Sequence, residues 1–251
     1  VLRTPENYPK NIKREARSGT KLLCQMLCVI RHWFPHLSIT LVGDGDYARA
    51  LLGSFCQRLS IGLVSRLRAD ARLYDFATDK KRKSRLAQLG NRLERPQESL
   101  WEKITIRWYG GRTHEVKVSS KNGLWRAGKK SAVIALKAVW VQLRPHDEII
   151  LMTTNLDISI ITIIEEYVRR WNIEVTFREC REHLGVETQR QWSDYAIARS
   201  TPLLFALYTL ITLIGNAIFN TKGVIAESTA WYRKSHLTFS DLLESVRQEV
   251  G

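Results

Sequence analysis

The chain has 251 residues, of which 39 are Lys or Arg and 25 are Asp or Glu, giving a formal net charge of +14. Such an excess of positive charge attracts polyanions, and it favours a nucleic-acid ligand over a ribosomal, membrane-surface or purely solubilising role. The four cysteines show no paired spacing, and the N-terminus has no signal-peptide pattern. A disulfide-rich secreted protein is therefore excluded, and we expect a reducing cytoplasm.

The first part of the chain predicts a parallel α/β arrangement. Residues 1–19 are polar and are expected to form a loop or arm, whereas residues 20–34 have helical apolar spacing. Residues 37–43 and 61–66 are apolar runs typical of buried strands, and a helix is expected between them at about 47–59. A strand, a helix and a second strand in this order favour parallel pairing.

Residues 71–155 predict a β-rich insertion in the α/β domain. The stretch begins with a charged region whose basic run, 79–85, is either a solvated loop or a phosphate contact. Two dipeptides, Gly110-Gly111 and Asn122-Gly123, are typical of hairpin turns. Four segments in the insertion favour strands: 103–109, 114–119, 132–143 and 148–153.

Helices are expected again after the insertion, at about 159–183 and 194–220, with a short one capped by Ser240. The segment 203–219 is apolar enough to raise the question of a membrane span. Its 17 residues are at the lower limit of length, so a fully buried core helix is the favoured interpretation.

A central carboxylate stands out on the helix expected at 159–183. Helical geometry places Ile164, Val168 and Trp171 on one apolar stripe and Tyr167, Arg170, Glu174 and Arg181 on a second stripe about a quarter-turn away. Glu174 should then be partly shielded from water and flanked by cations. The alternative is an ordinary solvated face with i,i+4 ion pairs.

Asp44 is the second candidate, because it follows a buried strand and precedes a helix. Open α/β folds bind ligands at the carboxyl ends of parallel strands. Alternatively, Asp44 or Asp46 only caps the next helix. Two-metal phosphoryl transfer needs carboxylates from different elements of a fold, and a strand-end Asp and a helix-borne Glu are suitable residues.

The spacing of Tyr167, Arg170, Glu174 and Arg181 in YVRRWNIEVTFRECR resembles the signature of DDE-type insertion-sequence transposases, in the insertion-sequence-four-like group. That signature is Tyr, two residues, Arg, three residues, Glu, six residues, Lys; here Arg181 replaces the Lys and keeps its charge. The continuation HLGVETQRQW is also similar to this group.

The resemblance implies an RNase H-like catalytic domain and a role for each matching residue. Glu174 would be the final carboxylate of the triad, and Asp44 the second, with Tyr47 as the aromatic three residues later and Asp46 as the fallback. Tyr167, Arg170 and Arg181 would contact DNA phosphates. The implied reaction is DNA cleavage and strand transfer with Mg²⁺, or Mn²⁺, at Asp44 and Glu174.

The family's first Asp has no match, because no Asp precedes Asp44. We therefore expect a partial chain without the first strands of the fold, inactive alone but able to bind DNA. The expected division is 1–70 for the first half of the core, 71–155 for the insertion, and 156–251 for the core helices and tail. The alternative is a non-catalytic basic DNA-binding protein derived from a transposase. The resemblance further implies a homodimer on DNA in the bacterial cytoplasm, away from membranes.

Overall fold

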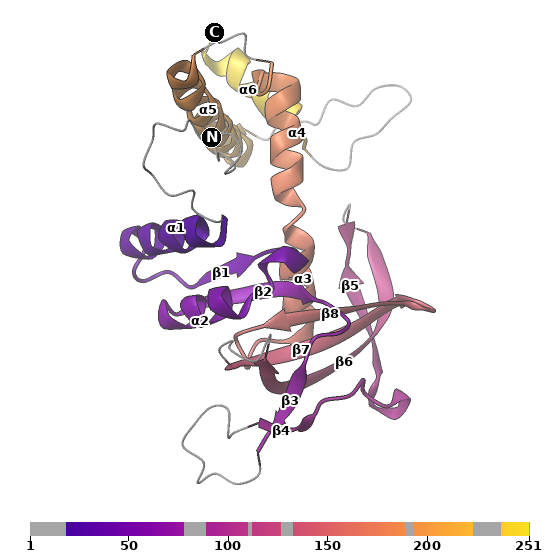
Figure 1. Ribbon diagram of the computed structural model, residues 1–251. Coiled ribbons are helices and arrows are strands. Elements are labelled where there is room, and N and C mark those ends of the chain that lie inside the picture. Colours follow the sequence, from indigo (N-terminus) through magenta and orange to yellow (C-terminus); the bar gives the residue numbers. More distant parts are fainter. Residues whose placement is uncertain are drawn as a thin grey trace, which may run out of the picture. The chain divides into compact units, whose positions relative to one another are not determined.

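The computed structural model describes residues 19–77, 89–109, 112–126, 133–188, 193–222 and 237–250 (Figure 1). The expected N-terminal arm up to residue 18, the basic run 79–85 and the Gly110-Gly111 turn lie outside these ranges. The chain forms two units, one within residues 3–171 and the other within residues 172–251. We call them the sheet unit and the helical unit.

The start of the sheet unit confirms the expected parallel pair. Helix α1 (Gly19–Trp33) is followed by strand β1 (Ile39–Val42), helix α2 (Ala50–Arg58) and strand β2 (Ile61–Leu67). Strands β1 and β2 are parallel, and Val42 lies opposite Val64. The helix expected from residue 47 begins only at Ala50, because Gly45–Tyr47 forms a 3-10 turn, η2, instead.

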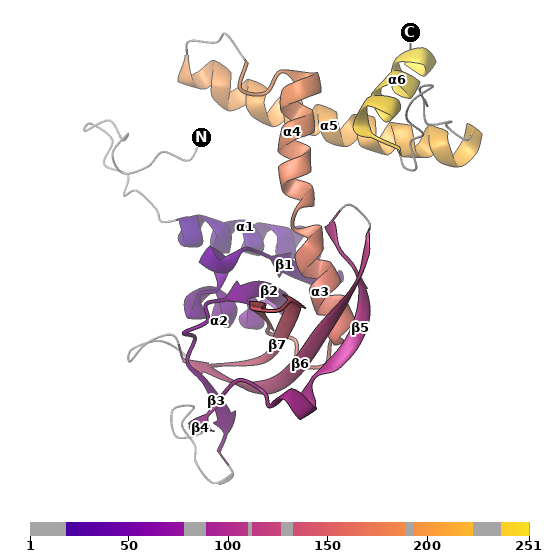
Figure 2. The same cartoon turned by 90° about the vertical axis from the view of Figure 1, so that its right-hand side faces the viewer.

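The insertion is β-rich, as expected, and it continues the same sheet. Strand β8 pairs antiparallel with β2, so the order across the sheet is β1-β2-β8-β7-β6-β3-β4, with β5 on β6. Figure 2 shows the neighbouring strands β7, β6 and β5. Among the strand pairs that the structure describes, only β1–β2 is parallel. The insertion's elements are β3 (Leu73–Phe76), β4 (Leu89–Arg92), the 3-10 turn η3 (Glu98–Leu100), β5 (Glu102–Arg107), β6 (Thr113–Arg126), β7 (Val133–Arg144) and β8 (Asp147–Thr153).

The prediction of a turn at Asn122-Gly123 is wrong, because both residues lie inside β6 and pair with Lys137 and Leu136 of β7. Gly123 has a different reason to be glycine. A Cβ there would stand 2.7 Å from the carbonyl oxygen of Tyr74 and 2.4 Å from Leu93 Cδ1. The residue therefore permits close packing against β3 and the residue after β4.

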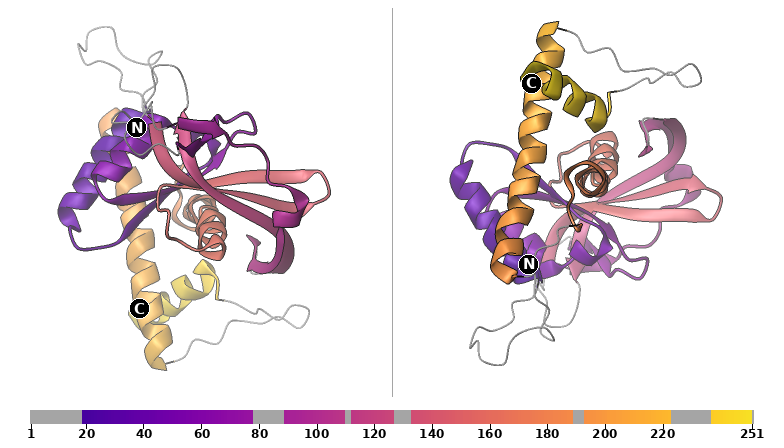
Figure 3. Two further views of the ribbon diagram at one scale, coloured as in Figure 1. Left: turned by 90° about the horizontal axis from the view of Figure 1, so that it is seen from below. Right: turned by 90° about the horizontal axis from the view of Figure 1, so that it is seen from above.

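The sheet unit buries apolar side chains on both faces of its sheet. One cluster joins α1 and α2 to one face through side chains such as Leu52, Leu63 and Trp140. The other joins helix α3 (Ile160–Arg169) to the opposite face, with Ile163, Ile164 and Tyr167 against Val64 and Leu151. Figure 3 shows α1 and α2 on one side of the sheet and α3 on the other.

The single helix expected at 159–183 is two helices. α3 ends at Arg169, and α4 (Asn172–Leu184) starts after a tight turn at Arg170 and Trp171. The amides of these two residues donate to carbonyls three residues back, Tyr167 and Val168, so the α-helical hydrogen bonds stop there. The predicted apolar stripe does not continue across the turn: Ile164 is fully buried in α3, whereas Trp171 is 46% exposed.

The helical unit packs α4, α5 (Asp194–Lys222) and α6 (Phe239–Val250) through aromatic contacts. Phe177 meets Phe205 edge-on at 5.3 Å between ring centroids, and Tyr208 stacks on Phe239 at 4.5 Å. The expected stop at Gly185 is confirmed. Its φ of +75° suits glycine, and the next amide, of Val186, donates to the carbonyl of Cys180.

The prediction that α5 is a fully buried core helix is wrong. Among the residues of α5 whose burial is described, only Ile211 and Gly215 are buried, whereas Leu203 and Leu213 are more than 60% exposed. Contacts with α4 and α6 cover only part of a helix that is apolar all round. Residues 195–221 form a helix that is long and apolar enough to cross a membrane. One such helix is weak evidence for a membrane span, because core helices of soluble proteins can have the same length and composition.

Helix α6 starts one residue earlier than expected, and Ser240 does not cap it. Asp241 reaches back to Thr238 instead, accepting hydrogen bonds from its amide at 2.8 Å and its hydroxyl at 2.7 Å. The carbonyl of Thr238 accepts from the amide of Leu242. Thr238 is thus the residue at the N-terminal boundary, and Asp241 plays the reciprocal part of a capping box.

Candidate active site

Asp44 lies just beyond the carboxyl end of β1, where its carboxylate is exposed. Its Oδ1 accepts a hydrogen bond of 3.0 Å from the amide of Asp46 and so caps η2. Asp44 therefore caps this 3-10 turn, whereas helix α2, which begins after Arg49, has no side-chain cap. Its Oδ2 has no hydrogen-bond partner among the described residues, which leaves one carboxylate oxygen available to a ligand.

The main chain around Asp44 is held by β2. The amide of Gly43 donates to the carbonyl of Val64 at 3.0 Å. The fully buried hydroxyl of Ser65 donates to the carbonyl of Asp44 at 2.5 Å. Two contacts from neighbouring residues of one strand fix the backbone, so the Asp44 carboxylate projects from a rigid support at the edge of the sheet.

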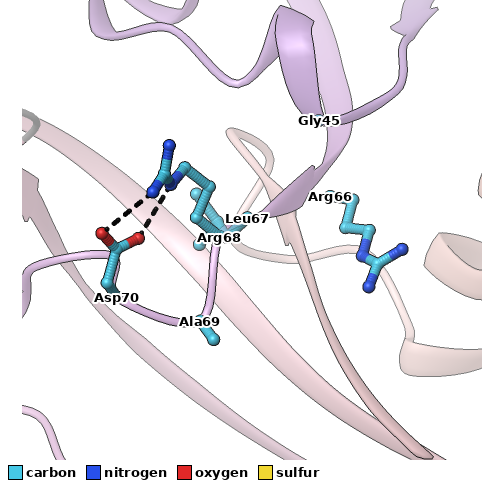
Figure 4. Close-up of a pocket in the computed structure, with 6 residues that line it drawn as sticks. All are labelled: Gly45, Arg66, Leu67, Arg68, Ala69 and Asp70. Atoms are coloured by element: carbon cyan, nitrogen blue, oxygen red, sulfur yellow. Dashed lines mark hydrogen bonds and ion pairs between the residues drawn. The ribbon is translucent and has the colours of Figure 1, made fainter.

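Arg66 stands beside Asp44 because the parallel strands are in register. Each described β1 residue pairs with the β2 residue 22 positions later, and the same offset carries residue 44 to residue 66. Arg66 is the one exposed position in β2. Its guanidinium has no hydrogen bond or ion pair within the described part of the chain. Figure 4 shows it pointing away from the neighbouring Arg68–Asp70 pair.

Tyr167 and Arg170 reach the same region from α3 and its C-terminal end. Tyr167 is buried in the cluster under α3, which leaves no open ring face for stacking with a base. The Arg170 guanidinium carbon lies 5.8 Å from the centroid of the Tyr167 ring and 6.0 Å from that of Trp171. Trp171 in turn contacts Tyr109 edge-on at 5.6 Å. Arg170 is thus held over aromatic rings.

The electrostatics of Tyr167 connect it to Asp44. Burial is the main reason that the pKa of the Tyr167 hydroxyl is raised, and Tyr109 and Asp44 raise that pKa further. The cations of Arg170 and Arg66 lower it in part. The tyrosine hydroxyl, two arginines and the strand-end carboxylate therefore lie within electrostatic range of one another, all within the sheet unit. The hydroxyl stays protonated at neutral pH and can donate a hydrogen bond.

Glu174 and Arg181, the other two signature residues, lie on α4 in the helical unit. Glu174 is in the first turn and is partly buried, which agrees with the expected shielding. A carboxylate in a first turn is favoured by the helix dipole. Arg181 is exposed and forms a 3.4 Å ion pair with Glu187. Surface pairs of this kind contribute little, so the guanidinium can exchange partners.

The donor sets offer two places for a divalent cation. Carboxylate oxygens are the ligands preferred by Mg²⁺, and Asp44 with its free Oδ2 fits that chemistry. The second place is on one face of α4. There, among the described residues, three possible ligand atoms from Glu179, Glu182 and His183 lie within 4.8 Å of one another. His183 Nε2 and Glu179 Oε2 are 3.4 Å apart, an ordinary i,i+4 contact.

Sequence reasoning missed Arg66 and Tyr109. For Arg66 a signal was present. Once residues 37–43 and 61–66 are taken as parallel strands, their carboxyl ends must be adjacent, and Arg66 is the charged residue that follows the second apolar run. For Tyr109 we find no local signal. It reaches the site because β5 pairs with β6, which depends on contacts distant in sequence.

The sequence matches the family model of the transposase DDE domain over residues 16–196, which is most of the chain. The chain therefore belongs to the DDE transposase domain family. Its α/β fold, with one mostly antiparallel eight-stranded sheet, is consistent with the RNase H-like architecture expected from the sequence. No protein with curated annotation matches the chain.

Proposed function

We propose that this chain supplies the catalytic site of a DNA transposase that cleaves and joins DNA by two-metal phosphoryl transfer. Asp44 and Glu174 are its metal-binding carboxylates, and the metal is Mg²⁺, with Mn²⁺ as a substitute. Mg²⁺ held by these carboxylates would supply Lewis-acid stabilisation and would lower the pKa of the attacking hydroxyl or water. Membership of the DDE transposase domain family supports this reaction class.

The observation that carries the proposal is the environment of Asp44. An exposed carboxylate with a free oxygen sits at the carboxyl end of a parallel pair, and its charge reaches the buried hydroxyl of Tyr167. Arg66 and Arg170 act on the same hydroxyl. Solvated charged faces rarely combine a rigid carboxylate with a buried tyrosine and two arginines. A buried group whose pKa is perturbed by specific charged neighbours, as that of Tyr167 is, is a common mark of functional sites.

The signature residues bind and orient DNA in this proposal. Arg170, held against Tyr167 and Trp171, donates fork-like hydrogen bonds to a phosphate near the cut. The Tyr167 hydroxyl donates one hydrogen bond to the same backbone, since burial keeps it protonated. Arg181 exchanges its surface pair with Glu187 for a phosphate oxygen. The insertion-sequence-four-like group is the expected subfamily.

Metal binding tests the proposal directly. Titration of the full chain with MnCl₂ in a calorimeter should show binding that weakens at least ~10-fold in Asp44→Asn and in Glu174→Gln, because each variant removes a charged ligand. Asp46→Asn tests the fallback position. Glu182→Gln is the matched control on α4. Loss of binding in that control, with Asp44→Asn and Glu174→Gln unaffected, would place the metal on the α4 cluster and sink the proposal.

A second candidate is a DNA-binding protein that keeps the fold without the reaction. It is favoured by the formal net charge of +14, which suits phosphate binding whether or not a metal is held. It agrees with our expectation that this chain alone binds DNA but does not cut it. Mg²⁺-dependent strand cleavage by the chain, lost in Asp44→Asn, would exclude this candidate.

We further propose that the protein acts as a homodimer on paired DNA ends in the bacterial cytoplasm, without contact to a membrane.

A further inference from the structure

A basic groove leads away from Asp44 along the sheet unit. A pocket of about 640 Å³ is lined by Gly45, which follows Asp44, and by Arg68 and Asp70. A second pocket of about 510 Å³ is lined by Arg68, Asp70, Arg72 and Arg126. The two pockets share the lining residues Leu67, Arg68 and Asp70, so they form one continuous feature, which we call the arginine groove.

The floor of the arginine groove is rigid. Leu67 is 3% exposed and Trp125 is 5% exposed, and both belong to the core cluster under α1 and α2. The loop that forms its wall is tied at both ends: the amide of Ala71 donates to the carbonyl of Arg68, and the amide of Arg126 donates to the carbonyl of Arg72. The groove is therefore preformed and needs no reorganisation to accept a ligand.

The charge of the groove is net positive. The lining of the groove holds four arginines, Arg66, Arg68, Arg72 and Arg126, and one acid, Asp70. Asp70 pairs with Arg68 at 2.9 Å while both side chains remain more than 70% exposed. Such an exposed pair contributes little to stability, and Arg68 can turn to a stronger anion at small cost. Arg72 is exposed, and its guanidinium has no hydrogen bond or ion pair within the described ranges.

We propose that the arginine groove binds the phosphates of the DNA strand that extends from the candidate metal site, an inference that rests on the proposed function. A strand carries one phosphate per ≈ 3.4 Å of helix axis, so consecutive phosphates meet consecutive arginines along an open groove. Guanidinium groups bind phosphates through two parallel hydrogen bonds. Arg72 and Arg126 contact the strand directly, and Arg68 exchanges Asp70 for a phosphate. None of the three belongs to the family signature.

The test is the salt dependence of DNA binding by the full chain. A fluorescein-labelled duplex of 30 base pairs is titrated by anisotropy at several NaCl concentrations. In Arg72→Ala/Arg126→Ala, the slope of log K against log salt should fall by about 1.8, because two phosphate contacts are lost at ≈ 0.9 each. Arg72→Lys/Arg126→Lys should restore most of the slope, since the charges return.

The matched control is Lys21→Ala/Arg58→Ala, which removes two exposed cations on α1 and α2 outside the groove. Its slope should change by less than half as much. An equal change in both double variants would mean that only net charge matters and would overturn the inference, as would an unchanged slope in the groove variant. Binding of an acidic peptide that is lost in the groove variant, while DNA binding keeps its parental salt slope, would instead assign the groove to a protein ligand and also overturn it.

Manganese binding in the same variants separates the two proposals. If the groove variant binds Mn²⁺ like the parent but keeps the parental salt slope, the groove inference fails and the proposed metal site stands. If the parent binds no Mn²⁺ while the groove variant shows the expected smaller slope of log K against log salt, the proposed metal site fails and the DNA-binding groove stands.

Discussion

The sheet unit and the helical unit use apolar residues in opposite ways. In the sheet unit, long side chains such as Leu52, Met152 and Ile164 are completely buried on one or other face of the sheet. In the helical unit, α5 carries a comparable apolar content but leaves Leu203, Leu210 and Leu213 more than half exposed. Hydrophobic composition therefore indicates burial only where the fold provides a covering layer on each side.

The signature residues are divided between these units. Tyr167 and Arg170 belong to the sheet unit, whereas Glu174 and Arg181 lie on α4. The turn at Arg170–Trp171 separates them, although the spacing reads as one continuous helix. Tyr167 and Arg170 are thus carried by a different unit from Glu174 and Arg181, and the two units can be probed separately.

The largest difference is expected from core truncation. Leu52→Ala removes a fully buried side chain and should lower the free energy of unfolding by about 2–5 kcal/mol. Leu213→Ala, 63% exposed on α5, should change it by less than about 0.5 kcal/mol. Urea unfolding followed by circular dichroism measures both. Equal effects would show that α5 is covered in solution and would break the contrast between the units.

Cysteine labelling should sharpen the same contrast. Burial raises the pKa of the Cys56 thiol to about 11, and burial followed by the nearby Glu179 raises the pKa of the Cys180 thiol. Both thiols react only after local opening. We expect Cys180 to react with a thiol reagent at least ~10-fold faster than Cys56, since a unit with fewer buried contacts opens at lower free energy. Cys24→Ser/Cys28→Ser is the background, and faster labelling of Cys56 would reverse the ranking.

The cap of α6 is a smaller effect confined to the helical unit. Thr238→Ala removes the hydroxyl contact with Asp241 and should lower stability by about 0.5–2 kcal/mol. Ser240→Ala, on the exposed neighbour, is the control and should cost less. The measurement is thermal unfolding of the two variants, and a larger loss in Ser240→Ala would return the capping role to that residue.

The smallest expected effect is a shift in the titration of Tyr167. Because its pKa is raised in the folded chain, this group stabilises the fold fully below the pKa of an unfolded tyrosine, and the contribution is lost as pH rises through the folded value. Asp44→Asn should lower the pKa of Tyr167, and Arg66→Ala should raise it. Absorbance titration against a Tyr167→Phe reference measures the shift. No change in either variant would separate Tyr167 from Asp44.

The sequence predicts the parallel pair, the β-rich insertion and the stop at Gly185, because each depends on local patterns of two to ten residues. The turn at Arg170 was not predictable in this way, since EYVRRWNIEV contains neither proline nor glycine. The turn predicted at Asn122-Gly123 is wrong because glycine also suits a strand position where another backbone packs closely. That backbone belongs to Tyr74, which is distant in sequence. The neighbours of Asp44 from β5 and α3 likewise depend on long-range pairing.

The pairing of β8 with β2 has a consequence for protein engineering. Ser65, which holds the carbonyl of Asp44, lies directly opposite Met152 of β8. Shortening the insertion at β3, β4 or β5 leaves that ladder in place, whereas removing the β7–β8 hairpin strips one edge from the strand that supports Asp44. A minimal version of this domain should therefore retain residues 133–153, even though they lie about 90–110 positions beyond the carboxylate they help to hold.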